Sequence, residues 1–451
     1  MRTLKETERL RILVVAVGEP WPLDSGGRLH LYHVLDQIDE RAEVTLLLPR
    51  AAQHLQDLPR PMRVIALSAG ETPALPTETP APPTNTAAPT NSPLMRSFRR
   101  YFGHNAQIEA WLRRQATRRR YDVIMLNGAV LGQHIDACRA PVVWNPQDEL
   151  VLPTLRAAQF SPYARWLPAL RRSLFYAIYE RYVARRAAAT IYVSRIDAAY
   201  ARTWAGDARL EVVQNGVDFD AFRPAESPAE PGTVVFVGAL EFPPNVDAVR
   251  NFAGVIWPHI HAGGHDRRLL IVGRRPTPEV RALAGIPGVS VIPDVPDVRP
   301  YLERAAVVIV PIRTGGGLKN KVLEGCALRR PVVAHPRALA GLSARIGHDL
   351  LSAAETESWV RAVARLLQHP AHAERIARNG YEWVTRAHSW ETTGCRFFEI
   401  LSAAAGRRKN VASPQRAPDA AAQTPTIKDA RVPEPIQWSW PSPVGVVASH
   451  S

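Results

Sequence analysis

Short apolar runs alternate with longer segments of helical periodicity along this chain, and that alternation restricts it to an α/β fold built on parallel sheets. The first series of runs lies at residues 12–17, 44–48, 64–66, 123–125, 142–144 and 189–193. The pattern restarts in a second series at residues 234–237, 269–272, 289–292, 307–310 and 332–334. Two series in a chain of 451 residues predict two α/β domains in succession.

Turn chemistry and proline content divide the chain. An Asn-Gly pair and several prolines place an interdomain linker at 216–231, after an N-terminal domain of residues 1–215 and before a C-terminal domain of residues 232–405. Two segments rich in proline, an insertion at 71–93 and a tail at 406–451, cannot bury enough apolar surface, so we predict that both are disordered. Helices expected to finish the C-terminal domain lie near 356–367, 372–384 and 390–404.

Composition excludes several classes of protein. No run approaches the ~18 uninterrupted apolar residues of a membrane-spanning helix, and the N-terminus lacks the apolar stretch of a signal peptide. The cysteines, Cys138, Cys326 and Cys395, are far apart without CxxC spacing, so neither a disulfide framework nor a metal site is indicated. We expect a cytoplasmic protein with no metal and no bound cofactor.

The net charge of +14 is unevenly distributed. Residues 94–120 carry a net +7 and residues 162–188 a net +5, almost all of it from arginine. Basic helical surfaces of this kind suit anionic lipid headgroups, and they are equally typical of a solvated helix face. We therefore expect either peripheral contact with the inner face of a membrane through these stretches or a plain basic surface. No motif that reads RNA or DNA accompanies the charge, so nucleic acid is not an expected partner.

Ligands of open parallel sheets bind at the carboxyl ends of the strands, so the residues that follow the apolar runs are the informative ones. Gly26 and Gly27 follow the first run at the start of a helix, where free backbone N–H groups either hold an anion or simply form a turn. No GxGxxG motif follows this run, which argues against a nicotinamide-dependent dehydrogenase.

A glycine triplet at residues 315–317 precedes Lys319 and Lys321 at the start of another predicted helix. Arginine supplies 51 of the 56 basic residues, and these two are the only lysines between residues 6 and 408. Glycines let a phosphate approach the main chain, and compact ammonium groups beside a helix N-terminus stabilise it. We predict a phosphate site here. Glu324, one turn further, is expected either to bind ribose hydroxyls or to stabilise the helix dipole.

A third strand end carries the sequence Gln147-Asp148-Glu149. The acidic pair is suited to act as a general base or to orient an acceptor hydroxyl, and it is equally suited to cap the next helix.

Beyond these single patterns, the chain resembles the retaining nucleotide-sugar glycosyltransferases of glycosyltransferase family 4 over about residues 10–405. The resemblance is closest to a branch with a GGG-Leu-Lys-Asn-Lys-Val-Leu-Glu loop, and it implies the GT-B fold, two facing Rossmann-like domains. By that resemblance the second domain holds a nucleotide diphosphate sugar, and the first holds a carbohydrate or lipid-linked acceptor. No metal is implied, because positive side chains and a helix N-terminus neutralise the diphosphate. The segments that carry the resemblance are VVQNGVD, VVFVGALEFPPNVDAVRNF, LLIVGRRPTPEVRAL and VVIVPIRTGGGLKNKVLEGCALRRPVVA.

The resemblance also implies roles for single residues. Glu324 matches the second glutamate of the family's E-x7-E motif, which holds the donor ribose, and Lys319 and Lys321 would face the diphosphate. The expected catalytic residues are Asp148, Glu149 and Lys321. The expected donor contacts are Gly26, Gly27, Asn245, Arg274, Gly315, Gly316, Gly317, Leu318, Lys319, Asn320, Lys321, Val322 and Glu324.

The chain departs from the family pattern at four positions. Gly316 stands where relatives have the first glutamate of the motif, and Gln147 where they commonly have histidine. Ala239 and Asn245 stand where many relatives have arginine and lysine, so Lys319 and Lys321 would have to substitute. The prediction is a retaining glycosyltransferase of polysaccharide biosynthesis. Its alternatives are a nucleotide-sugar epimerase of the same fold and a catalytically weak relative that binds sugar or lipid.

Overall fold

The computed structural model describes residues 9–23, 26–50, 54–67, 93–116, 120–147, 149–151, 154, 166–224, 228–314 and 319–406. The expected insertion, apart from Pro93, and the expected tail after residue 406 lie outside this part of the chain. The same is true of Asp148, Gly315, Gly316, Gly317 and Leu318.

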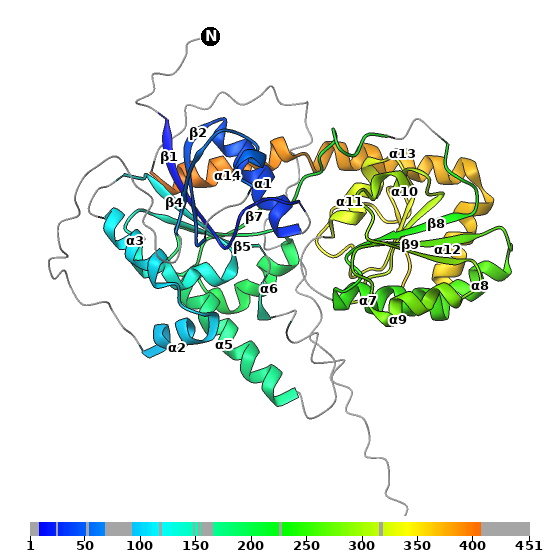
Figure 1. Ribbon diagram of the computed structural model, residues 1–451, viewed down its shortest axis with the longest axis horizontal. Helices are drawn as coiled ribbons and strands as arrows, with labels where there is room; N and C mark the ends of the chain where they lie inside the picture. The colour runs from blue at the N-terminus through cyan, green and yellow to red at the C-terminus, as the bar shows by residue number, and fades with distance from the viewer. Residues whose placement is uncertain are drawn as a thin grey trace, which may run out of the picture. The chain divides into compact units, whose positions relative to one another are not determined.

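The first sheet has seven parallel strands in the order β3-β2-β1-β4-β5-β6-β7 (Figure 1). The order reverses between β1 and β4, as it does in Rossmann-like sheets. The edge strand β7 was not predicted, because Glu211 interrupts its apolar run. The strands are β1 (Leu10–Ala16), β2 (Ala42–Leu48), β3 (Arg63–Ala66), β4 (Val123–Asn127), β5 (Val142–Gln147), β6 (Ala189–Tyr192) and β7 (Leu210–Val212).

The second sheet repeats this plan with six parallel strands in the order β10-β9-β8-β11-β12-β13. Five of them are the predicted runs, and the sixth, β13, is a two-residue edge strand. The strands are β8 (Thr233–Val237), β9 (Arg268–Gly273), β10 (Val289–Pro293), β11 (Val307–Val310), β12 (Val332–Ala334) and β13 (Leu351–Ser352). Two parallel α/β sheets confirm the predicted fold class.

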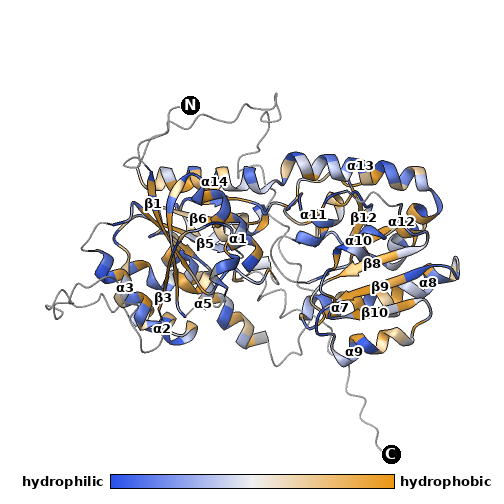
Figure 2. Cartoon of the chain, turned by 45° about the horizontal axis from the view of Figure 1, so that its top comes forward, coloured by the Kyte–Doolittle hydropathy of each residue, from blue (hydrophilic) through white to orange (hydrophobic). Residues whose placement is uncertain are grey.

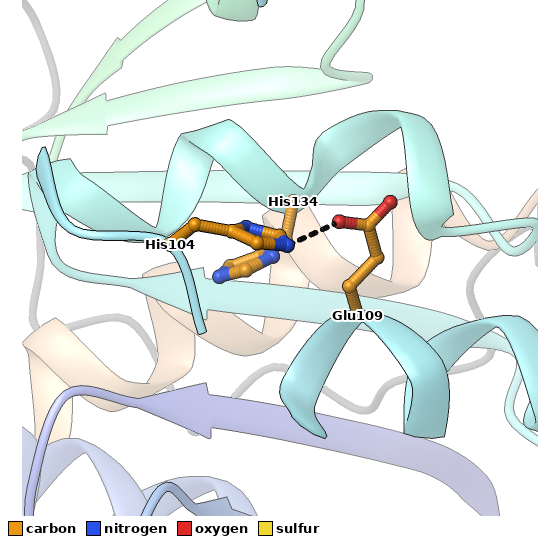
Figure 3. Close-up of side chains that lie close together, drawn as sticks. All are labelled: His104, Glu109 and His134. Atoms are coloured by element: carbon orange, nitrogen blue, oxygen red, sulfur yellow. Dashed lines mark ion pairs between the residues drawn. The ribbon is translucent and has the colours of Figure 1, made fainter. Parts of the chain in front are cut away.

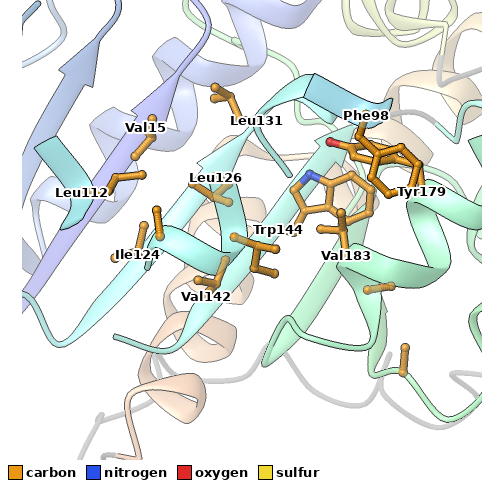
Figure 4. Packing of buried hydrophobic residues seen from close by; sticks show 14 of the residues in the cluster. Val15, Phe98, Leu112, Ile124, Leu126, Leu131, Val142, Trp144, Tyr179 and Val183 are labelled. Atoms are coloured by element: carbon orange, nitrogen blue, oxygen red, sulfur yellow. The ribbon is translucent and has the colours of Figure 1, made fainter. Parts of the chain in front are cut away.

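Helices cover both faces of the first sheet because its strands are apolar on both sides. On β1, Leu13 and Val15 belong to one buried cluster, and Ile12 and Val14 belong to the opposite one. Figure 4 shows the first of these clusters, in which Trp144 of β5 packs beside Tyr179. The covering elements on that side are α2 (Pro93–Phe102), α3 (Ala106–Ala116), the 3-10 helix η3 (Ala129–Ala137), α5 (Trp166–Ala184) and α6 (Arg195–Ala205).

The strands of the second sheet are likewise apolar, as the orange strands in Figure 2 show. A π-helical segment, Phe252–Ile256, joins α7 to α8. The helices of this half are α7 (Pro243–Asn251), α8 (Trp257–Ala262), α9 (Pro278–Arg281), α10 (Arg299–Glu303), α11 (Asn320–Ala327), α12 (Thr356–Gln368) and α13 (Pro370–Ala387). None of the described helices is both long and apolar enough to span a membrane.

The last helix, α14 (Trp390–Ala404), differs from expectation in its location. It was expected to finish the second domain, but Trp390, Phe397 and Leu401 are buried in the first domain's core beside α1 (Gly26–Asp39) (Figure 1). The periodicity predicted a helix with one apolar face, and such a pattern does not show which sheet that face covers.

The chain therefore crosses between the domains twice, and the two crossing segments adjoin. The N–H of Val217 donates to the carbonyl of His388 at 2.8 Å, and Val217 forms an isolated β-bridge with Ser389. A Cβ atom on Gly216 would lie 2.4 Å from the backbone nitrogen of Trp390, so only glycine allows this approach.

Candidate active site

The candidate site is built at the carboxyl ends of the central strands, where the strand order of each sheet reverses. In the first sheet the segment after β1 leads to α1, and in the second sheet β8 leads to α7 and β11 leads to α11. The predicted site residues that the structure describes lie mostly on these three connections.

The N-termini of two helices from different domains approach each other here. α1 begins at Gly26 and α11 at Asn320, and a Cβ atom on Gly26 would lie 3.9 Å from Nδ2 of Asn320. Gly26 and Gly27 are exposed. Each helix N-terminus leaves backbone N–H groups without helical partners and carries the positive end of the helix dipole. The arrangement suits a ligand with two neighbouring negative groups.

Lys321 supplies a cation at the end of β8. Its Nζ donates to Oδ1 of Asn245 at 3.0 Å and lies 4.7 Å from the ring centroid of Phe236. Asn245 is fixed in turn by a 2.8 Å hydrogen bond from its Nδ2 to the carbonyl of Ala239. A Cβ atom on Gly238 would lie 2.9 Å from both Nζ of Lys321 and Nδ2 of Asn245. A larger residue at position 238 would therefore displace the ammonium group of Lys321 or the amide of Asn245.

Desolvation tunes the charges of this site. Burial lowers the pKa of Lys321 to about 7, with Glu324 opposing the shift and Lys319 adding to it. Burial also raises the pKa of Glu324 to about 7, and Lys321 opposes that shift. A bound dianion would restore the full charge of Lys321, since a nearby negative charge favours the protonated form.

Two other expected donor contacts lie in different surroundings. Nε of Arg274 is 3.7 Å from Oε1 of Glu241, in the loop that follows β8. Val322 is completely buried in the second domain's core, so it can contact a ligand only through its main chain.

The third strand end differs from expectation. Glu149 is 1 % exposed, its Oε1 accepts from the N–H of Val151 at 2.5 Å, and its carboxyl group hydrogen-bonds to that of Glu180. Glu180 also accepts from the N–H of Leu150 at 2.9 Å. These contacts give Glu149 a structural role inside the first domain and argue against its expected role as general base. Gln147 has a positive φ of 73°. Its side chain lies beside the glycine pair, because a Cβ atom on Gly27 would lie 3.2 Å from Oε1 of Gln147.

A cluster of possible metal ligands lies elsewhere in the first domain. Ligand atoms of His104, Glu109 and His134 are all within 4.8 Å of one another (Figure 3). Glu109 is already paired with Arg99 at 2.9 Å and Arg113 at 2.6 Å, and with His104 at 3.1 Å. Two guanidinium groups on one carboxylate oppose the approach of a divalent cation. We interpret the cluster as an ion-pair network that joins α2 to α3.

Two families of sequences match the two halves of the chain. Residues 25–216 match the family described as glycosyl transferase 4-like domain, and residues 231–369 match the family described as glycosyl transferases group 1. The chain is a glycosyltransferase. No curated protein matches this glycosyltransferase in sequence.

Solved structures show the same fold at low sequence identity. Sucrose-phosphate synthase from Thermosynechococcus elongatus is similar with a TM-score of 0.62 and 16% identity, covering 87% of this chain and 98% of that one. The Anabaena protein HepE in complex with UDP-glucose gives 0.60 and 16%, covering 87% and 100%. WaaG, a glycosyltransferase involved in lipopolysaccharide biosynthesis, gives 0.57 and 14%, covering 87% and 99%. The glycosyltransferase therefore has the two-domain GT-B fold that the resemblance implied.

His30 is a residue of the glycosyltransferase that the sequence patterns did not single out. The structure buries it on α1 between Asn145 and Asn215. The signal that could have found it is the pair of asparagines, Asn127 and Asn145, at the ends of two buried strands. Such amides need polar partners, and a histidine on the covering helix is one.

Proposed function

We propose that the enzyme transfers a sugar from a nucleoside diphosphate sugar and holds the diphosphate between the N-termini of α1 and α11. The observation that carries this proposal is the 3.9 Å approach of Asn320 Nδ2 to the Cβ position of Gly26, with the ammonium of Lys321 one residue further along α11. Helix N-termini and a lysine ammonium are the groups that commonly stabilise phosphate oxygens.

The donor class is supported by the neighbours as well as by the site. HepE, which has the same fold, was solved with UDP-glucose. Glu324 stands one turn into α11, and its carboxyl group is suited to accept hydrogen bonds from ribose hydroxyls. We infer a nucleotide of this kind in the second domain and the acceptor in the first.

The proposed reaction needs no metal and retains the configuration of the sugar. An acceptor hydroxyl attacks the anomeric carbon, the bond from that carbon to the diphosphate oxygen breaks, and the hydroxyl proton passes to the departing phosphate. Lys321 and the free N–H groups of α11 and α1 stabilise the developing negative charge. Because Glu149 is buried, the departing phosphate is the base in this proposal. Metal independence follows from the positive groups already present, and retention rests on the family resemblance alone.

The test is donor binding and nucleoside diphosphate release across a panel of nucleotide sugars, with and without membrane extract. Lys321→Ala is expected to weaken donor binding roughly 10- to 100-fold, because a charge-assisted hydrogen bond contributes about 1.5–3 kcal/mol. Arg361→Ala on α12, an exposed charge with a side chain 72% accessible, is the matched control and should bind like the wild type.

Two results would contradict the proposed function or its site. Absence of binding and release for every donor would reject a transferase, and unchanged affinity in both Lys321→Ala and Glu324→Ala would reject this site. Conversion of the donor to an isomeric nucleotide sugar, with no acceptor consumed, would identify the epimerase alternative instead. Donor binding without any release would identify the catalytically weak relative.

We also propose that the first domain contacts an anionic membrane through α2 and α5. α5 exposes an apolar stripe at helical spacing, with exposed fractions of 49% for Leu167, 44% for Leu170, 62% for Leu174 and 40% for Ile178. Apolar side chains on one face of a basic helix insert between headgroups, while the arginines attract anionic lipid.

The charges around the stripe are of one sign. The acidic residues of α3 and α5, Glu109 and Glu180, are both buried, and α2 has none. The exposed basic residues of α2 and α5 are Arg96, Arg100, Arg171, Arg172 and Arg181.

Flotation with vesicles containing phosphatidylglycerol tests this contact. The pair Leu170→Ser and Leu174→Ser should abolish flotation even at low salt, and Arg171→Gln with Arg172→Gln should weaken it in a salt-dependent way. Val255→Ser, which removes an apolar side chain 51% exposed in the second domain, is the control and should float like the wild type. Flotation that survives both pairs of substitutions would reject the membrane contact.

A further inference from the structure

A line of hydrogen-bonded polar side chains runs from the first sheet to the N-terminus of α11. Nδ2 of Asn145 donates to Oδ1 of Asn127 at 2.7 Å and lies 3.1 Å from Nε2 of His30. Nδ1 of His30 lies 2.8 Å from Oδ1 of Asn215, whose Nδ2 donates to Oδ1 of Asn320 at 3.0 Å. The line therefore joins β4, β5 and α1, through the residue that precedes the interdomain linker, to α11.

One arrangement of protons satisfies every contact in this line. Since Oδ1 of Asn215 can only accept, Nδ1 of His30 must carry the proton. Nε2 of His30 then accepts from Asn145, whose second N–H goes to Asn127. His30 is 1 % exposed, and burial lowers the pKa of its imidazole to about 4, so the ring is neutral as the line requires.

Asn215 occupies the place where the two crossing segments adjoin. Its carbonyl accepts from Nδ1 of His388 at 3.2 Å, which fixes the backbone, while His30 fixes the side chain. Asn320 is the first residue of α11, and its Nδ2 is the atom that lies beside Gly26. Whatever orients Asn215 therefore orients the N-terminus of α11 relative to that of α1.

We propose that His30 is a positioning residue: through Asn215 it holds Asn320, and with it the first turn of α11, against the glycine pair that begins α1. Its importance for catalysis rests on the proposed donor site, because these two helix N-termini are the groups assigned to the diphosphate. The positioning itself does not depend on that assignment, and it can be measured in the protein without ligand.

Hydrogen exchange followed by mass spectrometry tests the positioning. In His30→Leu, peptides covering residues 319–328 should exchange about tenfold faster than in the wild type, since one or two buried hydrogen bonds no longer hold the first turn. These residues lie in the other domain, and the described hydrogen bonds link them to His30 through Asn215, so faster exchange there reports on that link.

His33→Leu is the matched control. His33 lies one turn further along the same helix, is also buried, and stacks on Trp390 at 4.6 Å. It lies outside the described hydrogen-bond line, so its substitution should disturb the packing of α1 and α14 without accelerating exchange in 319–328. Equal acceleration in His33→Leu and His30→Leu would overturn the proposal.

Two conservative variants separate hydrogen bonding from shape. The amide of His30→Asn can replace Nδ1 and keep the contact to Asn215, whereas that of His30→Gln can replace Nε2 and keep only the contact to Asn145. We expect His30→Asn to restore most of the protection of 319–328 and His30→Gln to restore little. The reverse order, or equal loss in both, would overturn the proposal, and this comparison decides it even where His30→Leu folds poorly.

Donor binding supplies the second readout. If wild-type protein binds a nucleotide sugar, His30→Leu should weaken that binding about tenfold, His30→Asn should recover it, and unchanged affinity in His30→Leu would overturn the catalytic importance of the line. If the wild type binds no nucleotide sugar, the proposed function fails while the exchange comparison still decides the role of His30.

Discussion

Lys321 is one of the few lysines of this chain, and its ammonium group is also largely removed from water. Its ammonium is held over Phe236 and against Asn245, where water is partly excluded, and the pKa falls to about 7. At pH 8 most molecules therefore carry neutral Lys321 before a donor arrives. Because a bound negative charge favours the protonated form of Lys321, the site favours a dianion over a neutral sugar.

Donor binding at pH 8 is accordingly expected to take up close to one proton. A diphosphate beside Lys321 raises its pKa, so the fraction protonated increases on binding, whereas at pH 6 the lysine is already charged and uptake is small. Calorimetric titration in two buffers of different ionisation enthalpy measures the uptake. Lys321→Met should remove the dependence on buffer, and a variant that kept it would show that another group takes the proton.

Sequence patterns pointed to single residues where neighbours along the chain carry the signal, as with the glycine triplet and the lysines at 319 and 321. The structure places Nζ of Lys321 3.0 Å from Oδ1 of Asn245, and the role of Lys321 toward a diphosphate stays a prediction. The sequence could not show that Glu149 is buried. Its partner Glu180 comes from α5, and only the packed domain brings the two carboxyl groups together. His30 was not singled out because its partners, Asn145 and Asn215, come from distant parts of the chain.

At the scale of elements, the close contact between the two crossing segments requires glycine at position 216. Gly216→Ala should destabilise the protein by roughly 1–3 kcal/mol, because the new methyl group would overlap the backbone of Trp390. Gly254→Ala, at a helical position with nothing within 4 Å, is the matched control and should be neutral or slightly stabilising. Urea unfolding measures both, and equal midpoints for the two variants would contradict the close approach.

Helices and strands were predictable as elements because each is a local pattern, and eleven of the strands follow apolar runs of three residues or more. Their partners were less predictable. α14 has the length and boundaries expected for a last helix, yet it packs against α1 in the first domain. Nothing in an amphipathic stripe distinguishes two sheets of similar composition, so the assignment needs the three-dimensional path of the chain.

For the whole molecule, buried histidines predict sensitivity to acid. Burial lowers the pKa values of His30, His134 and His388 to about 4, well below the ~6.5 of an exposed histidine. Because the folded pKa is depressed, the stability these groups contribute is present above pH 6.5 and is lost as the pH falls towards 4, by up to roughly 3 kcal/mol each.

A buried carboxyl group opposes this trend. Burial raises the pKa of Glu180 to about 7, so its contribution decreases as the pH rises from about 4.5 to 7. We expect the urea midpoint to fall between pH 6.5 and 4.5, and to fall more steeply in Glu180→Gln, where one of the opposing carboxyl groups, which include Glu180 and Glu324, is gone. A midpoint that stayed level in both proteins over this interval would contradict the assignment of neutral buried histidines.

The return of α14 to the first domain also has a consequence for synthesis. Residues 10–212 emerge from the ribosome first. Helix α14, which contributes Trp390 and Phe397 to their core, is translated only after the whole second domain. The first domain therefore completes its packing last although it is made first. It is encoded by two separate stretches of the gene, whereas the second domain, from β8 to α13, is encoded by one continuous stretch.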